Sequence, residues 1–206
     1  MRGTVAIVDI GTGNLRSVWR AVNRAGAAAD VTNDPRRLET AAKIILPGVG
    51  NFARAMFGIR HTGLFDTLNE LVLHRKTPIL GICLGMELMA QASEEGRAQG
   101  LGWLSGSVKR FRPLEPKRYK VPFIGWSSVR QVRASRLFQG VDEEHEYYFL
   151  HSYYLDLRDR DCTVADADHE NRFPAAIESE NIFGVQFHPE RSHEAGIQVL
   201  RNFLAV

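Results

Sequence analysis

Runs of apolar residues and evenly spaced apolar positions alternate along the first half of the chain. Residues 5–8 (Val-Ala-Ile-Val) are a short continuous apolar run, which predicts a strand buried on both faces. Apolar side chains then recur at helical spacing, at positions 15, 18, 19 and 22, until Gly26 ends the pattern. We therefore expect a strand, a loop over residues 11–14 and an amphipathic helix at the start of the chain.

The same order of strand and helix continues as far as residue 83. Three further strands are expected, near residues 28–32, 43–46 and 77–82. Asp34-Pro35 begins one connecting helix, and apolar positions between 64 and 72 mark another. This alternation predicts a parallel sheet with helices on both faces. Ligands bind at the carboxyl ends of the strands in such sheets, where residues 11–14, residues 47–50 and Cys83 fall.

The second half of the chain is richer in strand patterns. Strands are expected over residues 107–111, 128–132, 147–155 and 163–167. Residues 175–179 and 182–187 flank Glu180-Asn181 and predict a hairpin, and apolar positions from 199 to 204 predict a closing helix. No repeat or long linker interrupts the pattern, so we predict one α/β domain over residues 1–206.

Composition and charge exclude several classes of protein. The net charge of +2 gives no reason to expect binding to nucleic acid or to a membrane. Cys83 and Cys162 make no disulfide framework and favour a reducing compartment, with no role evident for Cys162. The first apolar run is too short for the core of a signal peptide, and no run approaches a membrane span. We expect a soluble cytoplasmic protein.

Residues 81–85 (Gly-Ile-Cys-Leu-Gly) are the most informative motif. They join a predicted strand to a segment rich in helix formers, residues 86–90, with Cys83 at the apex of the turn. Glycines on either side of a nucleophile allow the tight turn of a nucleophile elbow, here with Cys in place of Ser. A thiol at a helix N-terminus is favoured as the reactive thiolate. The alternative is a small buried Cys beside a turn.

A cysteine nucleophile needs a base and a group that orients the base. Residues 188–190 (His-Pro-Glu) follow a predicted strand, and side chains two positions apart in extended chain share a side. Glu190 can then accept one imidazole N–H of His188 while the other nitrogen faces Cys83. Residues 47–50 (Pro-Gly-Val-Gly) suit an oxyanion hole of backbone N–H groups. The alternatives are a strand-end His with a solvated Glu, and a plain turn.

Four motifs in one order give the chain a family resemblance. They are residues 46–52 (LPGVGNF), 81–86 (GICLGM), 151–154 (HSYY) and 184–190 (GVQFHPE). With them the chain resembles the class I, triad-type glutamine amidotransferases over its whole length. Residues 11–18 (GTGNLRSV) resemble one branch, the glutaminase subunit of imidazole glycerol phosphate synthase. The resemblance implies a flavodoxin-like, mostly parallel sheet with helices on both faces and an additional antiparallel strand region.

The resemblance also implies the chemistry and the residues. Cys83 would attack the side-chain amide of glutamine and release ammonia, and the resulting thioester would be hydrolysed to glutamate, with no cofactor and no metal. The implied residues are the triad Cys83, His188 and Glu190, the oxyanion strand Gly48, Val49 and Gly50, and the glutamine-binding residues Glu87, His151, Ser152 and Tyr153.

A partner is implied as well. The ammonia would pass through a barrel-shaped cyclase subunit in a heterodimer, with Asn14, Trp126 and Arg191 at the interface. Little activity is expected from the subunit alone, which requires two states of the oxyanion strand.

The sequence departs from the usual family pattern at several positions. Glu87 stands where the family usually carries Gln. Its carboxylate would repel the α-carboxylate of glutamine and disfavour the Cys83 thiolate, unless it is protonated or turned aside. We predict weaker glutamine binding or slower thiolate formation.

Other departures lie near the implied interface. Phe123, Ser127 and Arg191 replace His, Asn and Lys, and Ile10 replaces Tyr. The partner is therefore either the cyclase of histidine biosynthesis or a related subunit that amidinates surface-polysaccharide sugars. An inactive glutaminase-like scaffold is the third possibility.

Two motifs point weakly to other classes. Gly11-x-Gly13 follows a strand as in dinucleotide-binding proteins, but Arg16 occupies the third glycine position. Residues 109–112 and 117–120 mix basic and aromatic side chains, as single-strand binders do. Because the net charge is near zero, we interpret them as a solvated loop or docking face.

Overall fold

The computed structural model describes residues 4–11, 13–142 and 144–206 and builds them around an eight-stranded sheet. Its order is β2-β1-β3-β4-β14-β13-β12-β9. The first five strands run parallel: β2 (Ala29–Thr32), β1 (Val5–Val8), β3 (Lys43–Gly48), β4 (Ile79–Cys83) and β14 (Ile182–Val185). The last three pair antiparallel: β13 (Asn171–Ser179), β12 (Thr163–His169) and β9 (Arg130–Gln131). The predicted parallel sheet is confirmed; Thr12 of the predicted loop lies outside the described residues.

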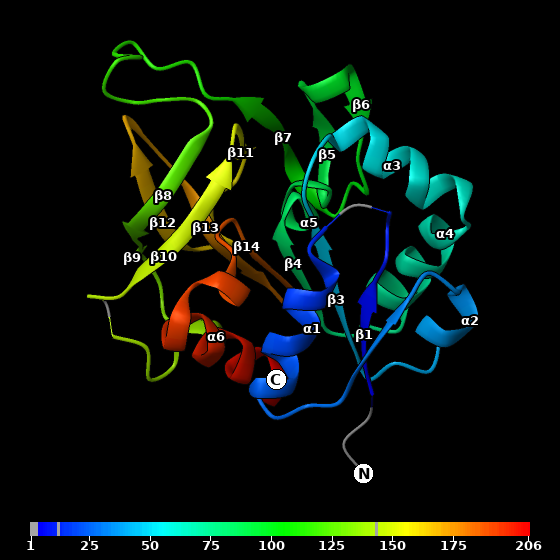
Figure 1. Cartoon of the computed structure of the whole chain (residues 1–206). Helices are drawn as coiled ribbons and strands as arrows, with labels where there is room; N and C mark the ends of the chain where they lie inside the picture. The colour runs from blue at the N-terminus through cyan, green and yellow to red at the C-terminus, as the bar shows by residue number, and fades with distance from the viewer. Residues whose placement is uncertain (1–3, 12, 143) are drawn as a thin grey trace.

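Helices cover both faces of this sheet, as predicted (Figure 1). On one face lie α1 (Leu15–Arg24) and α6 (His193–Ala205); on the other lie α2 (Pro35–Leu38), α3 (Phe52–His61), α4 (Leu64–Asn69) and the π-helical turn η1 (Glu70–His74). Alternate side chains of β1 serve the two cores, because Ile7 packs with α1 and α6 while Val8 packs with the other helices. No helix among the described residues is long and apolar enough to cross a membrane.

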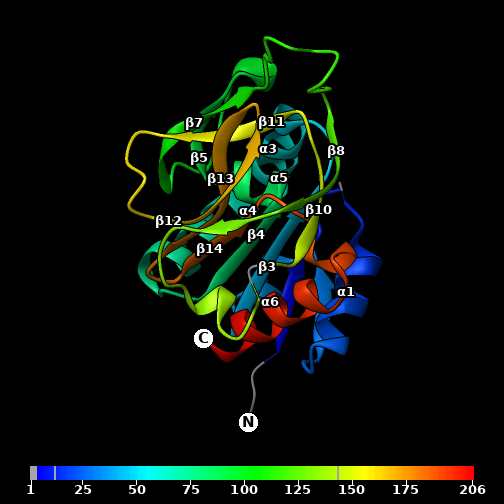
Figure 2. The ribbon, with the colours of Figure 1, turned by 90° about the vertical axis from the view of Figure 1, so that its left-hand side faces the viewer.

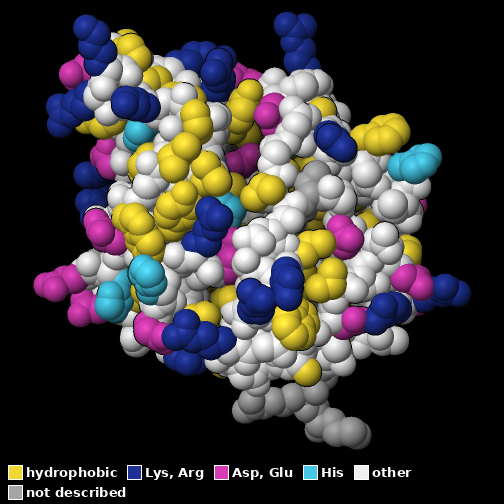
Figure 3. Space-filling model, in the orientation of Figure 1, with side chains coloured by type: hydrophobic (Ala, Val, Ile, Leu, Met, Phe, Trp, Pro, Cys, Tyr) yellow, Lys and Arg dark blue, Asp and Glu magenta, His cyan; other side chains and the backbone are white. Residues whose placement is uncertain are grey.

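Two smaller sheets form the additional strand region (Figure 2). One has four strands: β11 (Tyr153–Leu157), β7 (Leu104–Arg110), β5 (Ala90–Ser93) and β6 (Ala98–Gln99). The other is an antiparallel ribbon of β8 (Phe123–Ser128) and β10 (Glu146–His151). Short helical turns complete the chain: α5 (Leu84–Glu87), η2 (Glu95–Arg97), η3 (Arg136–Phe138) and η4 (Pro189–Arg191). Hydrophobic side chains gather on the surface of the ribbon, where Ile124 and Trp126 are exposed (Figure 3).

Several predicted boundaries were wrong. The helix expected over residues 86–90 is one turn that ends at Glu87, because Ala90 already pairs with β7 and this long-range pairing outweighs helix propensity. The strand expected over 128–132 is instead the last residue of β8, Ser128, followed by the two-residue strand β9. The strand expected over 147–155 is divided at Ser152, since β10 and β11 pair in different sheets. The sequence analysis missed α3.

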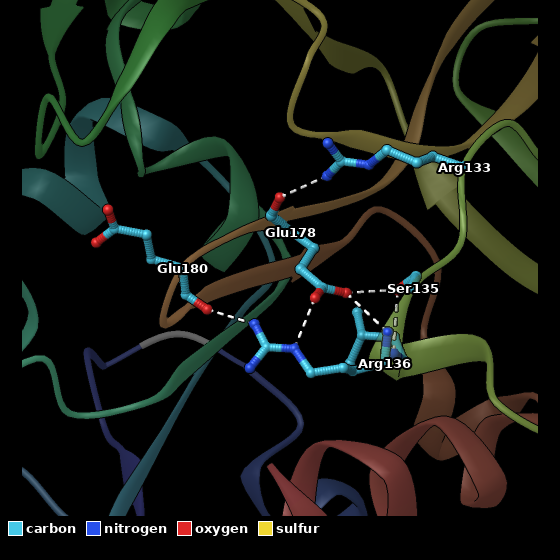
Figure 4. Close-up of polar contacts among 6 residues, drawn as sticks. Arg133, Ser135, Arg136, Glu178 and Glu180 are labelled. Atoms are coloured by element: carbon cyan, nitrogen blue, oxygen red, sulfur yellow. Dashed lines mark hydrogen bonds and ion pairs between the residues drawn. The ribbon is translucent and has the colours of Figure 1, made fainter.

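The predicted hairpin is present as β13 and β14, and a cluster of hydrogen bonds holds it to η3 (Figure 4). The Glu178 carboxylate accepts hydrogen bonds from the Ser135 hydroxyl at 2.7 Å and from Arg136 Nε at 2.7 Å. Burial raises the pKa of Glu178, but these donors outweigh it and hold the pKa below its ordinary value. Arg133 also donates to the Glu178 carbonyl, at 3.1 Å. The cluster anchors the hairpin whose second strand leads to His188.

Candidate active site

Cys83 ends β4 in a strained conformation, with φ of 52° and ψ of −111°. Such a positive φ costs a non-glycine residue about 1–3 kcal/mol, so the surrounding structure must impose it. The neighbouring glycines show how: a Cβ on Gly85 would lie 1.7 Å from the Leu46 carbonyl oxygen, and one on Gly81 2.7 Å from the Met86 nitrogen. The tight turn predicted around Cys83 is present. Only one helical turn, α5, follows it.

The Cys83 side chain lines a pocket of about 230 Å³. The pocket opens beyond the carboxyl ends of β3 and β4, where parallel sheets bind their ligands. Its lining residues are Val49, Gly50, Cys83, Leu84, Glu87, Glu95, Pro122, Leu150, His151, Ser152 and Tyr153. The fold thus gathers seven residues that the sequence analysis singled out, from three separate segments of the chain.

His188 and Glu190 form a buried pair beside this pocket. His188 is 3% exposed, and its Nδ1 lies 2.9 Å from Glu190 Oε1, which fixes the orientation of the ring. The pairing differs from the predicted extended chain, because Pro189 begins η4 and Glu190 lies within that turn. The other ring nitrogen, Nε2, is buried and has no hydrogen-bond partner among the described residues. It is available to a reacting group.

The protonation of His188 reflects its neighbours. Burial lowers the pKa of the imidazole, but the neighbouring Cys83 and the hydrogen-bonded carboxylate of Glu190 outweigh it and raise the pKa to about 10. An imidazolium at His188 would favour a thiolate at Cys83. A Cys-His pair of this kind is an activated nucleophile.

Glu87 lies one turn beyond Cys83 and is 4% exposed. Gln186 Nε2 donates a hydrogen bond to Glu87 Oε1 at 2.8 Å and lies 3.9 Å from Cys83 Sγ. Burial is the main reason that the pKa of Glu87 rises to about 8; nearby Glu95 adds to the rise, while Gln186 and His188 oppose it. This pKa favours a protonated carboxyl near neutral pH. The sequence analysis left open that Glu87 is protonated rather than a repelling carboxylate.

Gln186 and Glu95 are site residues that the sequence analysis missed. Gln186 is fully buried and precedes His188 by two positions, so the alternation that paired His188 with Glu190 could have found it. Glu95 accepts the Phe52 backbone N–H at 2.6 Å, at the start of α3. That contact joins segments far apart in sequence, and no local pattern indicates it.

His151 is a neutral member of the pocket. Its Nδ1 lies 2.6 Å from the Tyr153 carbonyl oxygen, so this nitrogen carries the proton and donates. Burial lowers the pKa of His151 to about 3, which keeps the ring uncharged at neutral pH. The neutral ring helps to shape the pocket without adding charge.

The predicted oxyanion strand lies next to Cys83. β3 extends two residues beyond its predicted end, so that Gly48 pairs with Cys83 across the parallel sheet. Val49 and Gly50 follow and line the pocket, and the φ of 106° at Gly50 is one that favours glycine. Residues 48–50 thus lie beside Cys83, and their role as an oxyanion hole stays a prediction.

The sequence profile of the family described as "Glutamine amidotransferase class-I" matches residues 6–206. The chain belongs to this family. The buried thiol and imidazole just described are the candidate reactive groups of this glutamine amidotransferase.

Relatives of this amidotransferase match almost its whole length. It is 40% identical to "Imidazole glycerol phosphate synthase subunit HisH 2" of Methanococcus maripaludis, over 97% of this chain and 98% of that protein. It is 44% identical to the HisH subunit of that synthase from Moorella thermoacetica, over 97% and 93%.

Solved structures share the fold of this amidotransferase at low sequence identity. A crystal structure of a glutamine amidotransferase aligns with a TM-score of 0.77 at 18% identity, covering 99% of this chain and 100% of the other. PurLQS from Thermotoga maritima aligns with a TM-score of 0.74 at 19% identity, covering 100% and 99%. The α/β fold of this family, predicted from the motifs, is confirmed.

The three predicted interface residues of this amidotransferase lie outside the pocket. Trp126 on β8 stacks on His193, with ring centroids 4.7 Å apart and planes within 5°. The Arg191 guanidinium lies 5.2 Å from the centre of the Tyr148 ring, which also contacts Trp126. Asn14 precedes α1, a helix that contacts η4, the turn that contains Arg191.

Proposed function

We propose that this protein is the glutaminase subunit of an imidazole glycerol phosphate synthase. The observation that carries the proposal is the strained Cys83 in a pocket, with the buried His188–Glu190 pair beside it. Relatives that bear this subunit's name and match nearly the whole chain support the choice of synthase. The chain acts as one domain, residues 1–206, in the cytoplasm, and forms a heterodimer with a cyclase subunit.

The first half of the reaction releases ammonia. The Cys83 thiolate attacks the side-chain amide carbon of glutamine, and backbone N–H groups of residues 48–50 stabilise the oxyanion. Protonated His188 gives its proton to the leaving nitrogen, so the amide group departs as ammonia and a γ-glutamyl thioester remains. The hydrogen bond between Glu190 and His188 Nδ1 holds the ring in place.

The second half restores the enzyme. Neutral His188 removes a proton from water, and the resulting hydroxide attacks the thioester carbonyl. The carbon–sulfur bond breaks, glutamate leaves and the Cys83 thiolate is again paired with an imidazolium. The thiol and the imidazole supply the nucleophile and the acid–base groups, so the mechanism uses no cofactor.

The pocket suits the polar end of glutamine. Glu95 offers a carboxylate to the α-ammonium group, and the segment of His151, Ser152 and Tyr153 closes another side. No Lys or Arg is among the described residues that line the pocket. The α-carboxylate is therefore received by uncharged donors, which are backbone N–H groups and the hydroxyls of Ser152 and Tyr153.

The partner docks, in this proposal, on the face formed by Trp126, Arg191 and Asn14. Trp and Arg side chains that are exposed yet held by stacking are the types that anchor protein interfaces. Ammonia released between the subunits would stay unprotonated on its way to the acceptor. The substitutions Phe123 and Ser127 lie on the same strand as Trp126, so they bear on which partner docks.

Glutamate release tests this function. The chain is mixed with the cyclase subunit of the same organism, with and without an analogue of the cyclase's nucleotide substrate, and Cys83→Ala is the control. We expect release that needs both the cyclase and its ligand and that is lost in Cys83→Ala. Full labelling of Cys83 by a glutamine analogue without activation by this cyclase would favour the sugar-amidinating partner instead.

A further inference from the structure

Glu87 is an acid in a place that disfavours its charge. Its side chain is buried, it lines the pocket, and its described hydrogen bond comes from the Gln186 amide. A neutral amide satisfies one oxygen but does not neutralise a carboxylate. An ionised Glu87 would therefore be a buried charge without a cationic hydrogen-bond partner.

The groups that face Glu87 from neighbouring elements carry charges of both signs. Glu95 on η2 lines the same pocket and makes a second negative charge less favourable. The Gln186 amide and His188, beyond β14, favour an ionised Glu87, but the amide carries no charge and His188 is already paired with Glu190. Cys83 at the end of β4 contributes a thiolate during the reaction, which adds further negative charge.

The Gln186 side chain, which donates to Glu87, has an acceptor oxygen that no described residue satisfies. Its side chain is fully buried, and its Oε1 has no hydrogen-bond partner among the described residues. A protonated carboxyl has one O–H donor, whereas an ionised carboxylate accepts only. Protonation of Glu87 therefore adds an O–H donor to the buried region in which the Gln186 Oε1 acceptor has no hydrogen-bond partner among the described residues.

We propose that Glu87 is a proton-controlled positioning residue: glutamine binds to the site while the Glu87 carboxyl is neutral, and binding weakens as that carboxyl ionises. This inference rests on the proposed glutaminase function. A neutral Glu87 carboxyl has nearly the shape of an uncharged amide and adds no charge to the pocket, so the site keeps its function at neutral pH.

The pH dependence follows from linkage. Burial and Glu95 raise the pKa of Glu87 to about 8, so the carboxyl is neutral below that pH and ionised above it. Bound glutamine displaces water from the pocket and thereby favours the neutral carboxyl still more. By reciprocity, each pH unit above the pKa weakens glutamine binding by up to about tenfold, with proton uptake on binding.

Direct binding measurements separate this effect from catalysis. In the complex with the cyclase, Cys83→Ala holds glutamine without turning it over, so calorimetry gives the dissociation constant from pH 6 to 9.5. The comparison uses Glu87→Gln and Glu94→Gln in the same background. Glu94 is a matched control because it is the same residue type but pairs with Arg112 outside the pocket.

We expect the dissociation constant of the Cys83→Ala protein to rise above pH 8 relative to that of the Glu87→Gln variant. The Glu94→Gln variant should show the same pH dependence as the parent. In proteins with an intact Cys83, KM should also rise above pH 8 relative to that of Glu87→Gln, while kcat changes less. Coinciding profiles for the parent and Glu87→Gln would overturn the inference alone. Absence of glutamine binding at every pH would instead overturn the proposed function, and this inference with it.

Discussion

His188 shows at the scale of one residue how opposing effects set the chemistry. Burial alone would make the ring neutral, but Cys83 and Glu190 outweigh it, and the pKa rises to about 10. The ring is therefore an acid ready for the leaving group at neutral pH. In the proposed mechanism this acid depends on Glu190, which orients the ring through Nδ1.

Glu190→Gln tests this dependence. The amide keeps the size of the side chain but removes the negative charge that favours the imidazolium, so kcat should fall by on the order of 10²-fold. The Cys83 thiolate should also form at a higher pH, which the rate of alkylation of Cys83 against pH measures. Glu70→Gln is the control, because Glu70 is exposed and pairs with Arg75 on the surface.

If Glu190→Gln and Glu70→Gln had the same kcat and the same alkylation profile, Glu190 would have no part in setting the state of His188.

The turn between β4 and α5 is the element on which the site depends. Gly85 must lack a side chain, because a Cβ there would overlap the Leu46 carbonyl oxygen at 1.7 Å. Neither backbone segment can move without disturbing the pairing of β3 and β4 that places Gly48 opposite Cys83. Local packing thus stores the strain that exposes the thiol to the pocket.

Gly85→Ala should lower the free energy of unfolding by about 3 kcal/mol or more, because it overpacks two backbone segments. Gly102→Ala is the comparison: its φ of 78° is unfavourable for alanine, but nothing lies within 4 Å of the added carbon. That variant should lose only about 1–2 kcal/mol. Urea unfolding measures both, and equal losses would mean that the close approach to Leu46 is not what the turn requires.

The elements differed in how far the sequence could predict them. β1, β3 and β4 are continuous apolar runs buried on both faces, so their pattern alone was sufficient. β5 was missed because its residues read as helix formers and become a strand only by pairing with β6 and β7. α3 has apolar side chains at 52, 55, 56 and 59 behind an Asn51 cap, a helical signal that could have been used.

At the scale of the whole molecule, the pocket exists only because distant segments meet. The motifs predicted Cys83, His188 and Glu190, but no local pattern shows that Gln186 bridges toward Cys83 and Glu87. Glu95 likewise reaches the site through the start of α3. Long-range contacts of this kind depend on the complete fold, so residue type and spacing could not place them.

Trp126→Ala tests the proposed docking face. Trp126 is 41% exposed and stacks on His193, as an interface anchor would. Its loss should weaken binding to the cyclase subunit by about 30-fold, or about 2 kcal/mol. Trp19 is the control because it is also 41% exposed but lies on α1, where its indole donates to the Ala29 carbonyl.

Titration calorimetry with the cyclase measures both variants. Trp19→Ala should bind within about twofold of the parent, since surface contacts outside an interface contribute little. If the two tryptophan variants bound alike, the partner would have to dock on another face.

The most direct test of the account is covalent trapping of Cys83. The complex with the cyclase is treated with a diazo-ketone analogue of glutamine, and the labelled residue is found by mass spectrometry. Cys162→Ala is the control, because Cys162 is the other cysteine of the chain and lies outside the pocket. We predict one label on Cys83, protection by glutamine, full labelling in Cys162→Ala and none in Cys83→Ala. An unlabelled Cys83 in the active complex would contradict the claim that this thiol is the nucleophile.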